Sequence, residues 1–167
     1  MDIVVPIGAF AVSAGEGETL ACLGLGSCVA LALWDRHRAV AGLAHIMLPA
    51  APAATVARPW RYADLAVPAL LAALARAGAE PERLEAVLAG GAAMFGPTGS
   101  GRDIGAQNAQ AVAEALAGHA IPVRGEALGG RRGRSLRLVV SPAMRTVVRE
   151  SGGREVLLFG EDTPVAA

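Results

Sequence analysis

The order of apolar and polar positions divides the chain into short strand-like segments and two helical ones. Apolar, partly β-branched runs occupy residues 3–13, 27–34 and 40–48. Such runs, bounded by polar residues, are typical of buried strands. The last two flank a polar turn that begins at Asp35. The pattern therefore predicts a β-hairpin made of residues 27–34 and 40–48.

Two later segments have the periodicity of helices. Leucines recur at helical spacing over residues 64–77, with Asp64 as the expected cap and Gly78 as the stop. A second helix is expected over residues 104–118, and Asp103 stands in the position of its N-cap.

The remaining apolar runs read as strands. One is expected at residues 84–89, and three more close the chain at 123–128, 135–140 and 146–159, the last folded about a Ser-Gly-Gly turn. The helices are too few to alternate regularly with these strands. The pattern therefore favours an α+β domain over a Rossmann-type sheet.

Composition narrows the class of protein further. The chain has 167 residues, 53% of them hydrophobic, with a mean hydropathy of +0.44. Its most apolar stretch, residues 40–57, contains Pro49 and Pro52, which would break a membrane-spanning helix. No basic segment precedes the first apolar residues, so a secretory signal is not expected. We expect a single cytoplasmic domain over residues 1–167, without membrane insertion.

Charge gives little reason to expect nucleic acid or anionic lipid as a partner. Fifteen basic residues balance fifteen acidic ones, which argues against nucleic-acid binding. The local excess is the segment GGRRGRSLR, residues 129–137, which we expect to be a solvated turn because aromatic neighbours are lacking. A G-x-x-x-x-G pattern spans residues 96–101, but Arg102 and Asp103 follow where a nucleotide-binding loop needs lysine and Ser/Thr.

The two cysteines are expected to be free thiols, because disulfides are rare in the cytoplasm. Cys22, Cys28 and His45 do not predict a zinc site, since their spacing is unusual and no fourth ligand lies at a metal-like interval. No metal and no cofactor is expected.

Cys28 and His45 permit two interpretations. Each is compatible with an inert residue in a buried strand. Two features favour a catalytic pair instead. The residues before the cysteine, including Gly26 and Ser27, permit a tight backbone whose N–H groups can face a developing oxyanion. Antiparallel pairing across the turn after Asp35 would also bring His45 close to Cys28. A histidine that takes the thiol proton and returns it to a leaving amine supports acyl transfer.

Several segments together resemble the CheD family of chemoreceptor glutamine deamidases. They occur in the order LGLGSCVALALWD, GLAHIMLP, RYAD, LAGGAAMF, DIGAQNAQAV and LGGRRGRS. The resemblance implies an α/β (α+β) domain with a mixed β-sandwich core and outer helices, akin to the catalytic domains of glutamine-deamidating toxins. It implies that Cys28 attacks a glutamine carboxamide and that His45 activates the thiol and protonates the departing ammonia. The residues alone are equally compatible with a cysteine hydrolase of another amide.

The resemblance also implies partners and a third catalytic position. The substrate would be the cytoplasmic helices of methyl-accepting chemoreceptors, and a CheC-type phosphatase would be a regulatory partner. The family's threonine, six positions before the nucleophile, is replaced here by Cys22. A thiol is a weak donor and acceptor, so catalysis would be slow or would rely on a backbone carbonyl, and a purely regulatory role is the alternative. For substrate binding we look to Phe95 and Gly96, from their apolar and flexible character.

Overall fold

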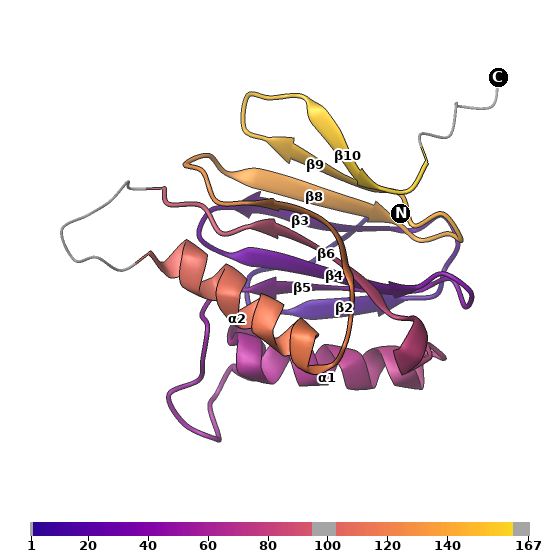
Figure 1. Ribbon diagram of the computed structural model, residues 1–167, viewed down its shortest axis with the longest axis horizontal. Helices are drawn as coiled ribbons and strands as arrows, with labels where there is room; N and C mark the ends of the chain where they lie inside the picture. Colours follow the sequence, from indigo (N-terminus) through magenta and orange to yellow (C-terminus); the bar gives the residue numbers. More distant parts are fainter. Residues whose placement is uncertain (1, 95–102, 162–167) are drawn as a thin grey trace.

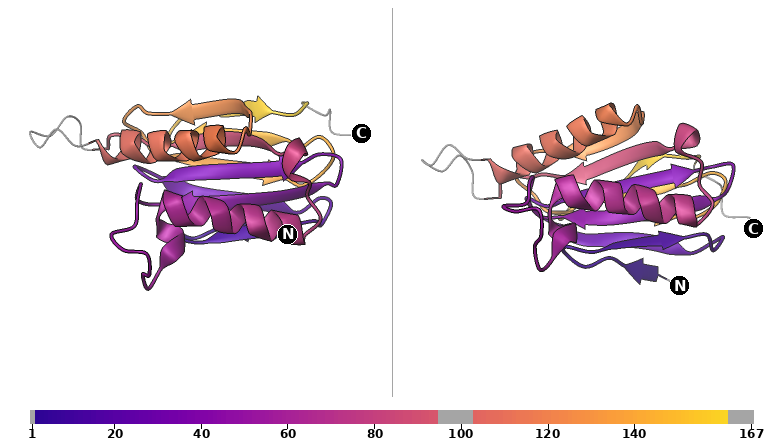
Figure 2. Two further views of the ribbon diagram at one scale, coloured as in Figure 1. Left: turned by 60° about the horizontal axis from the view of Figure 1, so that its bottom comes forward. Right: turned by 90° about the horizontal axis from the view of Figure 1, so that it is seen from below.

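The computed structural model describes residues 2–94 and 103–161 (Figure 1). Within these residues, two five-stranded sheets pack face to face, and two α-helices cover the outer face of one of them (Figure 2). One apolar core lies between the sheets and another lies between the second sheet and the helices. This mixed sandwich with outer helices confirms the expected α+β class.

The strands of each sheet come from distant parts of the chain. Sheet A has the order β1 (Asp2–Val4), β3 (Thr19–Leu25), β8 (Arg134–Val139), β9 (Thr146–Glu150) and β10 (Glu155–Phe159). Sheet B has the order β2 (Phe10–Ser13), β5 (Val40–Ile46), β4 (Val29–Asp35), β6 (Glu85–Gly90) and β7 (Val123–Leu128). The β1–β3 and β6–β7 pairs are parallel and the others are antiparallel.

The predicted hairpin is confirmed as β4 and β5, which pair from Asp35 and Val40 to Val29 and Ile46. Both strands are buried along their whole length. Successive side chains alternate between the two cores, because a strand points neighbouring residues to opposite faces of its sheet. Leu31 thus packs toward the helices, whereas the residues on either side of it in β4 pack toward sheet A.

The two helices were predicted with different success at their N-termini. Helix α2 (Ile104–Gly118) begins as expected, since the carboxylate of Asp103 accepts a hydrogen bond from the Ala106 N–H at 3.0 Å. Helix α1 (Ala63–Arg76) begins one residue before Asp64, so the prediction that Asp64 caps it is wrong. The Asp64 carboxylate instead accepts from the Ala51 N–H at 3.0 Å, which fixes the preceding loop. Short 3₁₀ turns, η1 (Pro59–Arg61) and η2 (Pro81–Arg83), precede α1 and β6.

Residues 3–13 do not form the single strand that was predicted. Pro6 lacks an N–H, and Gly8 has a φ of 76°, so the segment turns and divides into β1 and β2, which join different sheets. Strand β3 was not predicted. Between β1 and β2, the Val5 N–H donates to the Ala21 carbonyl at 2.8 Å. This turn places Val5 in the core between the sheets.

Of the helices in the described residues, none is both long and apolar enough to cross a membrane.

Candidate active site

Cys28 and His45 lie at one end of the core between the sheets. In the β4–β5 ladder His45 is paired with Ala30, and Cys28 precedes Ala30 by two residues. Both side chains therefore point to the same face of sheet B and are diagonal neighbours across the hairpin. His45 is 2% exposed and Cys28 is 9% exposed. The β4–β5 register, continued by one residue past the Val29–Ile46 pair, thus makes Cys28 and His45 diagonal neighbours, and their catalytic pairing stays a prediction.

The hydrogen bond of His45 fixes its tautomer. Its Nδ1 atom lies 3.1 Å from the carbonyl oxygen of Val5. A carbonyl only accepts hydrogen bonds, so Nδ1 carries the proton and Nε2 of the neutral ring has a free lone pair. Among the described residues, Nε2 is buried without any hydrogen-bond partner. A buried polar atom left unpaired costs about 1–3 kcal/mol, which points to a functional reason for keeping it.

Burial sets the charge state of both groups. Burial lowers the pKa of His45, although the hydrogen bond to Val5 opposes the shift. Burial likewise raises the pKa of the Cys28 thiol, while its own backbone N–H acts in the other direction. At neutral pH the pair is therefore a thiol beside a neutral imidazole, which suits proton transfer during attack rather than a preformed thiolate.

Residues 26–28 form the cysteine loop, which is held in place by hydrogen bonds that its carbonyl groups accept. The carbonyls of Gly26 and Cys28 accept from Ala92 and Gly91 N–H groups at 2.9 Å each, and Ser27 O accepts from Asn108 Nδ2 at 2.9 Å. Within the described part of the chain, the N–H groups of Gly26 and Ser27 donate to no acceptor. The loop thus keeps its donors available beside the cysteine.

Glycine at position 90 permits this close approach of two loops. Gly90 has a φ of 107°, and a Cβ placed there would lie 2.2 Å from the Cys28 carbonyl oxygen. Any side chain at position 90 would therefore push the C-terminal end of β6 away from the cysteine loop.

Asn108 is a supporting residue that the sequence analysis did not identify. It lies fully buried on α2, and its Nδ2 atom donates to Ser27 O and Met47 O, both at 2.9 Å. These carbonyls lie just beyond the last β4–β5 pair, Val29 and Ile46, where the ladder no longer satisfies them. The side-chain amide of Asn108 thus joins the cysteine loop to the end of β5, the strand that carries His45. The polar position in the apolar face of α2, between Ile104 and Val112, was the signal in the sequence.

Cys22 lies within β3, in the core between the sheets that also holds Cys28. It is fully buried in β3, and no hydrogen bond joins its thiol to His45 in the described residues. Burial and the neighbouring Cys28 both raise the pKa of the Cys22 thiol. The Val5 carbonyl, not Cys22, is the group that holds Nδ1 of His45. A catalytic role for Cys22 stays a prediction.

The other predicted features have mixed outcomes. Phe95, Gly96 and the G-x-x-x-x-G loop lie outside the described residues. The prediction that residues 129–137 form a solvated turn is wrong for Arg134. This residue is 9% exposed, and its guanidinium donates to the carbonyls of Gly90 and Gly129 at 3.2 Å and 2.7 Å. No group of three or more metal-ligating side chains occurs in residues 2–94 and 103–161.

A thiol and an unprotonated imidazole nitrogen on one face of a mixed sandwich are the groups that thiol-dependent acyl transfer requires. Comparison with known proteins agrees with this class. Residues 47–150 match the family model described as CheD chemotactic sensory transduction. The chain is 41% identical to the "Chemoreceptor glutamine deamidase CheD" of Thermotoga maritima over 161 residues, which are 96% of this chain and 99% of that protein.

Two further relatives carry the name "Probable chemoreceptor glutamine deamidase CheD". The protein of Haloarcula marismortui is 44% identical over 123 residues, covering 74% of this chain and 71% of the relative. That of Symbiobacterium thermophilum is 43% identical over 140 residues, covering 81% and 85%. The chain belongs to the CheD family.

Proposed function

We propose that this chain is a protein-glutamine deamidase that converts glutamine side chains in the cytoplasmic helices of chemoreceptors to glutamate. The names of its relatives support the reaction and the substrate class. The observation that carries the mechanism is the buried, unpartnered Nε2 of His45 on the same face as Cys28. We assign Cys28 as the nucleophile and His45 as the base.

In the first half of the reaction, Nε2 of His45 takes the Cys28 proton while Sγ attacks the carboxamide carbon. The negative charge that develops on the carbonyl oxygen is stabilised by the N–H groups of Gly26 and Ser27, which donate to no acceptor in the described part of the chain. The imidazolium then gives its proton to the amide nitrogen, the C–N bond breaks, and ammonia leaves a thioester on Cys28. Because burial lowers the pKa of His45, its protonated form is a stronger acid and gives up its proton to the leaving group more readily.

In the second half, water attacks the thioester and His45 takes its proton. The C–S bond breaks, the proton passes to the sulfur, and the free thiol and a glutamate side chain are released. No cofactor enters either step, and atoms and charge balance as glutamine plus water giving glutamate plus ammonium, because the departed ammonia takes up the proton of the new carboxylic acid.

The test is incubation of the purified protein with a chemoreceptor cytoplasmic fragment, followed by peptide mass spectrometry of each glutamine. Wild type should convert defined glutamines, and Cys28→Ala should convert none. Cys22→Ala is the matched control, because it removes a second buried thiol from the same core. Conversion by Cys28→Ala would refute the assignment, provided that all proteins show the same circular dichroism.

Binding to a CheC-type phosphatase is a further role that we expect from the family. A role in binding alone is the alternative because position 22 lacks the family's threonine. The Val5 carbonyl weakens this alternative, because it is another hydrogen-bond partner for His45. Phosphatase binding by Cys28→Ala, together with no deamidation by wild type, would favour the regulatory role.

A further inference from the structure

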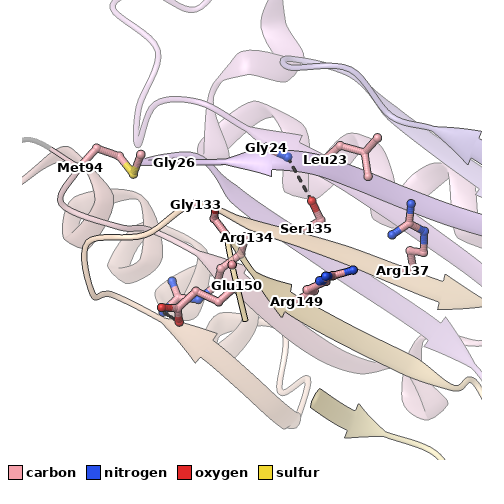
Figure 3. A pocket seen from close by; sticks show the side chains of 12 residues that line it. Leu23, Gly24, Gly26, Met94, Gly133, Arg134, Ser135, Arg137, Arg149 and Glu150 are labelled. Carbon is pink, nitrogen blue, oxygen red and sulfur yellow. Dashed lines mark hydrogen bonds and ion pairs between the residues drawn. The ribbon is translucent and has the colours of Figure 1, made fainter. Parts of the chain in front are cut away.

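A cleft of about 550 Å³ lies on the outer face of sheet A, beside the cysteine loop (Figure 3). It runs from Gly26 and Met94 across Ser135 to Arg137 and Arg149. Leu136 and Leu138 of β8 are buried in the core between the sheets, so the residues that alternate with them face outward. Arg149 is paired with Ser135 in the β8–β9 ladder and therefore shares that outer face.

Two of the guanidinium groups that line this cleft have no carboxylate partner among the described residues. Among the described residues, no carboxylate forms an ion pair with Arg137 or Arg149, although Arg149 Nε donates to the Gly153 carbonyl at 3.1 Å. Glu150, the one carboxylate among the described residues that line the cleft, lies 3.8 Å from Arg132 and 3.9 Å from Arg134. The chain as a whole is neutral, so this positive charge is local to the cleft.

The cleft borders the loop that leads to Cys28. Gly26, whose N–H has no acceptor among the described residues, also lines the cleft. The Met94 side chain lies against it, since a Cβ on Gly26 would be 3.2 Å from Met94 Cγ. A polypeptide segment that presents a glutamine to Cys28 past this loop has its neighbouring residues beside the cleft, where exposed Leu23 offers an apolar contact.

We propose that this cleft binds the flank of the substrate segment and that Arg137 and Arg149 recognise carboxylates next to the target glutamine. The inference rests on the proposed deamidase function and adds substrate specificity to it. Guanidinium groups bind carboxylates through paired charge-assisted hydrogen bonds. The reaction itself creates carboxylates, so a segment with one converted glutamine binds better than the unconverted segment. Neighbouring glutamines are therefore converted with increasing efficiency.

Binding is tested with the Cys28→Ala variant, which cannot turn over substrate. Two synthetic helical peptides are titrated by calorimetry; each has one central glutamine, and the flanks carry glutamate in one peptide and glutamine in the other. The acidic peptide should bind about tenfold more tightly, and adding Arg137→Gln and Arg149→Gln should remove that preference. Arg76→Gln, an exposed arginine on α1 away from the cleft, should keep it. Equal affinities for both peptides, or a preference that survives the double substitution, would overturn the proposal.

Turnover gives the second measurement. In protein that retains Cys28, the Arg137→Gln and Arg149→Gln double substitution should raise KM for the acidic peptide about tenfold. It should leave kcat within about twofold of wild type, because the arginines lie away from the reacting atoms. An equal fall of kcat for both peptides would contradict a role in recognition. If wild type converts no glutamine while Cys28→Ala still prefers the acidic peptide through the arginines, the deamidase function fails and the binding site stands.

Discussion

The Nδ1 atom of His45 lies 3.1 Å from the carbonyl oxygen of Val5, a residue forty positions earlier in the chain. Among the described residues, this main-chain contact is the only hydrogen bond of the imidazole. A backbone carbonyl cannot be lost by substitution, so the exchange of threonine for cysteine at position 22 need not disable the enzyme. The catalytic unit we propose is therefore Cys28, His45 and a main-chain acceptor.

Replacing Cys22 with alanine should leave catalysis nearly intact. The substitution removes a buried sulfur but no hydrogen bond to His45, so we expect kcat within about threefold of wild type and a loss of about 1 kcal/mol in the free energy of unfolding from the small cavity. Glutamine conversion and chemical denaturation measure the two effects. A loss of activity as complete as in Cys28→Ala would show that Cys22 is itself catalytic.

The neutral form of His45 should carry its proton on Nδ1. This follows from the Val5 carbonyl, which requires a donor, and it leaves Nε2 bare. Nitrogen-15 NMR of histidine-labelled protein distinguishes protonated from bare ring nitrogens, and with only three histidines the spectrum is simple to assign. Exposed His37 is the internal control. A His45 ring protonated on Nε2 at neutral pH would contradict the proposed base.

Activity should be lost at acid pH below the ordinary titration range of histidine. Burial lowers the pKa of His45 from its usual 6.5, so Nε2 stays unprotonated until the pH falls through that lowered pKa. Protonation then removes the base. The acid limb of kcat/KM, measured by ammonia release, should have its midpoint below 6.5, and His37→Gln should not move it. A midpoint above that value would mean that another group controls the reaction.

Loss of Asn108 should loosen the reaction centre. Its amide donates to Ser27 O and Met47 O, so Asn108→Ala leaves two carbonyls unpaired at the ends of the strands that carry Cys28 and His45. We expect the free energy of unfolding to fall by about 2–3 kcal/mol and kcat to fall about tenfold at a temperature where the variant is folded. Gln107→Ala, on the exposed side of α2, is the control. Unchanged stability and kcat in Asn108→Ala would exclude this supporting role.

Local chemistry made much of this fold predictable from the sequence. The cap at Asp103 and the turn after Asp35 depend on residues a few positions apart, and both the start of α2 and the β4–β5 register follow from them. The register then places His45 diagonal to Cys28. The sequence therefore predicted that these two residues lie on neighbouring strands, although not the tautomer of the histidine.

Two contacts of the proposed reaction centre that the sequence did not predict are non-local. The segment of residues 3–13 looked like one strand, but its division at Pro6 and Gly8 is what places Val5 against His45. The bridge from Asn108 to Ser27 likewise joins residues 81 positions apart. Such contacts depend on how the layers pack, and no pattern within a short window contains that information.

The most direct test of the central claim is to trap the covalent intermediate. Wild type is mixed with a glutamine peptide, quenched in acid within the first turnover, and digested for mass spectrometry. The account predicts that the peptide is attached through a thioester to Cys28, with the loss of ammonia, and that Cys28→Ala shows neither this adduct nor glutamate formation. Glutamate formed by a Cys28→Ala protein, or an adduct on Cys22 in the wild type, would contradict it.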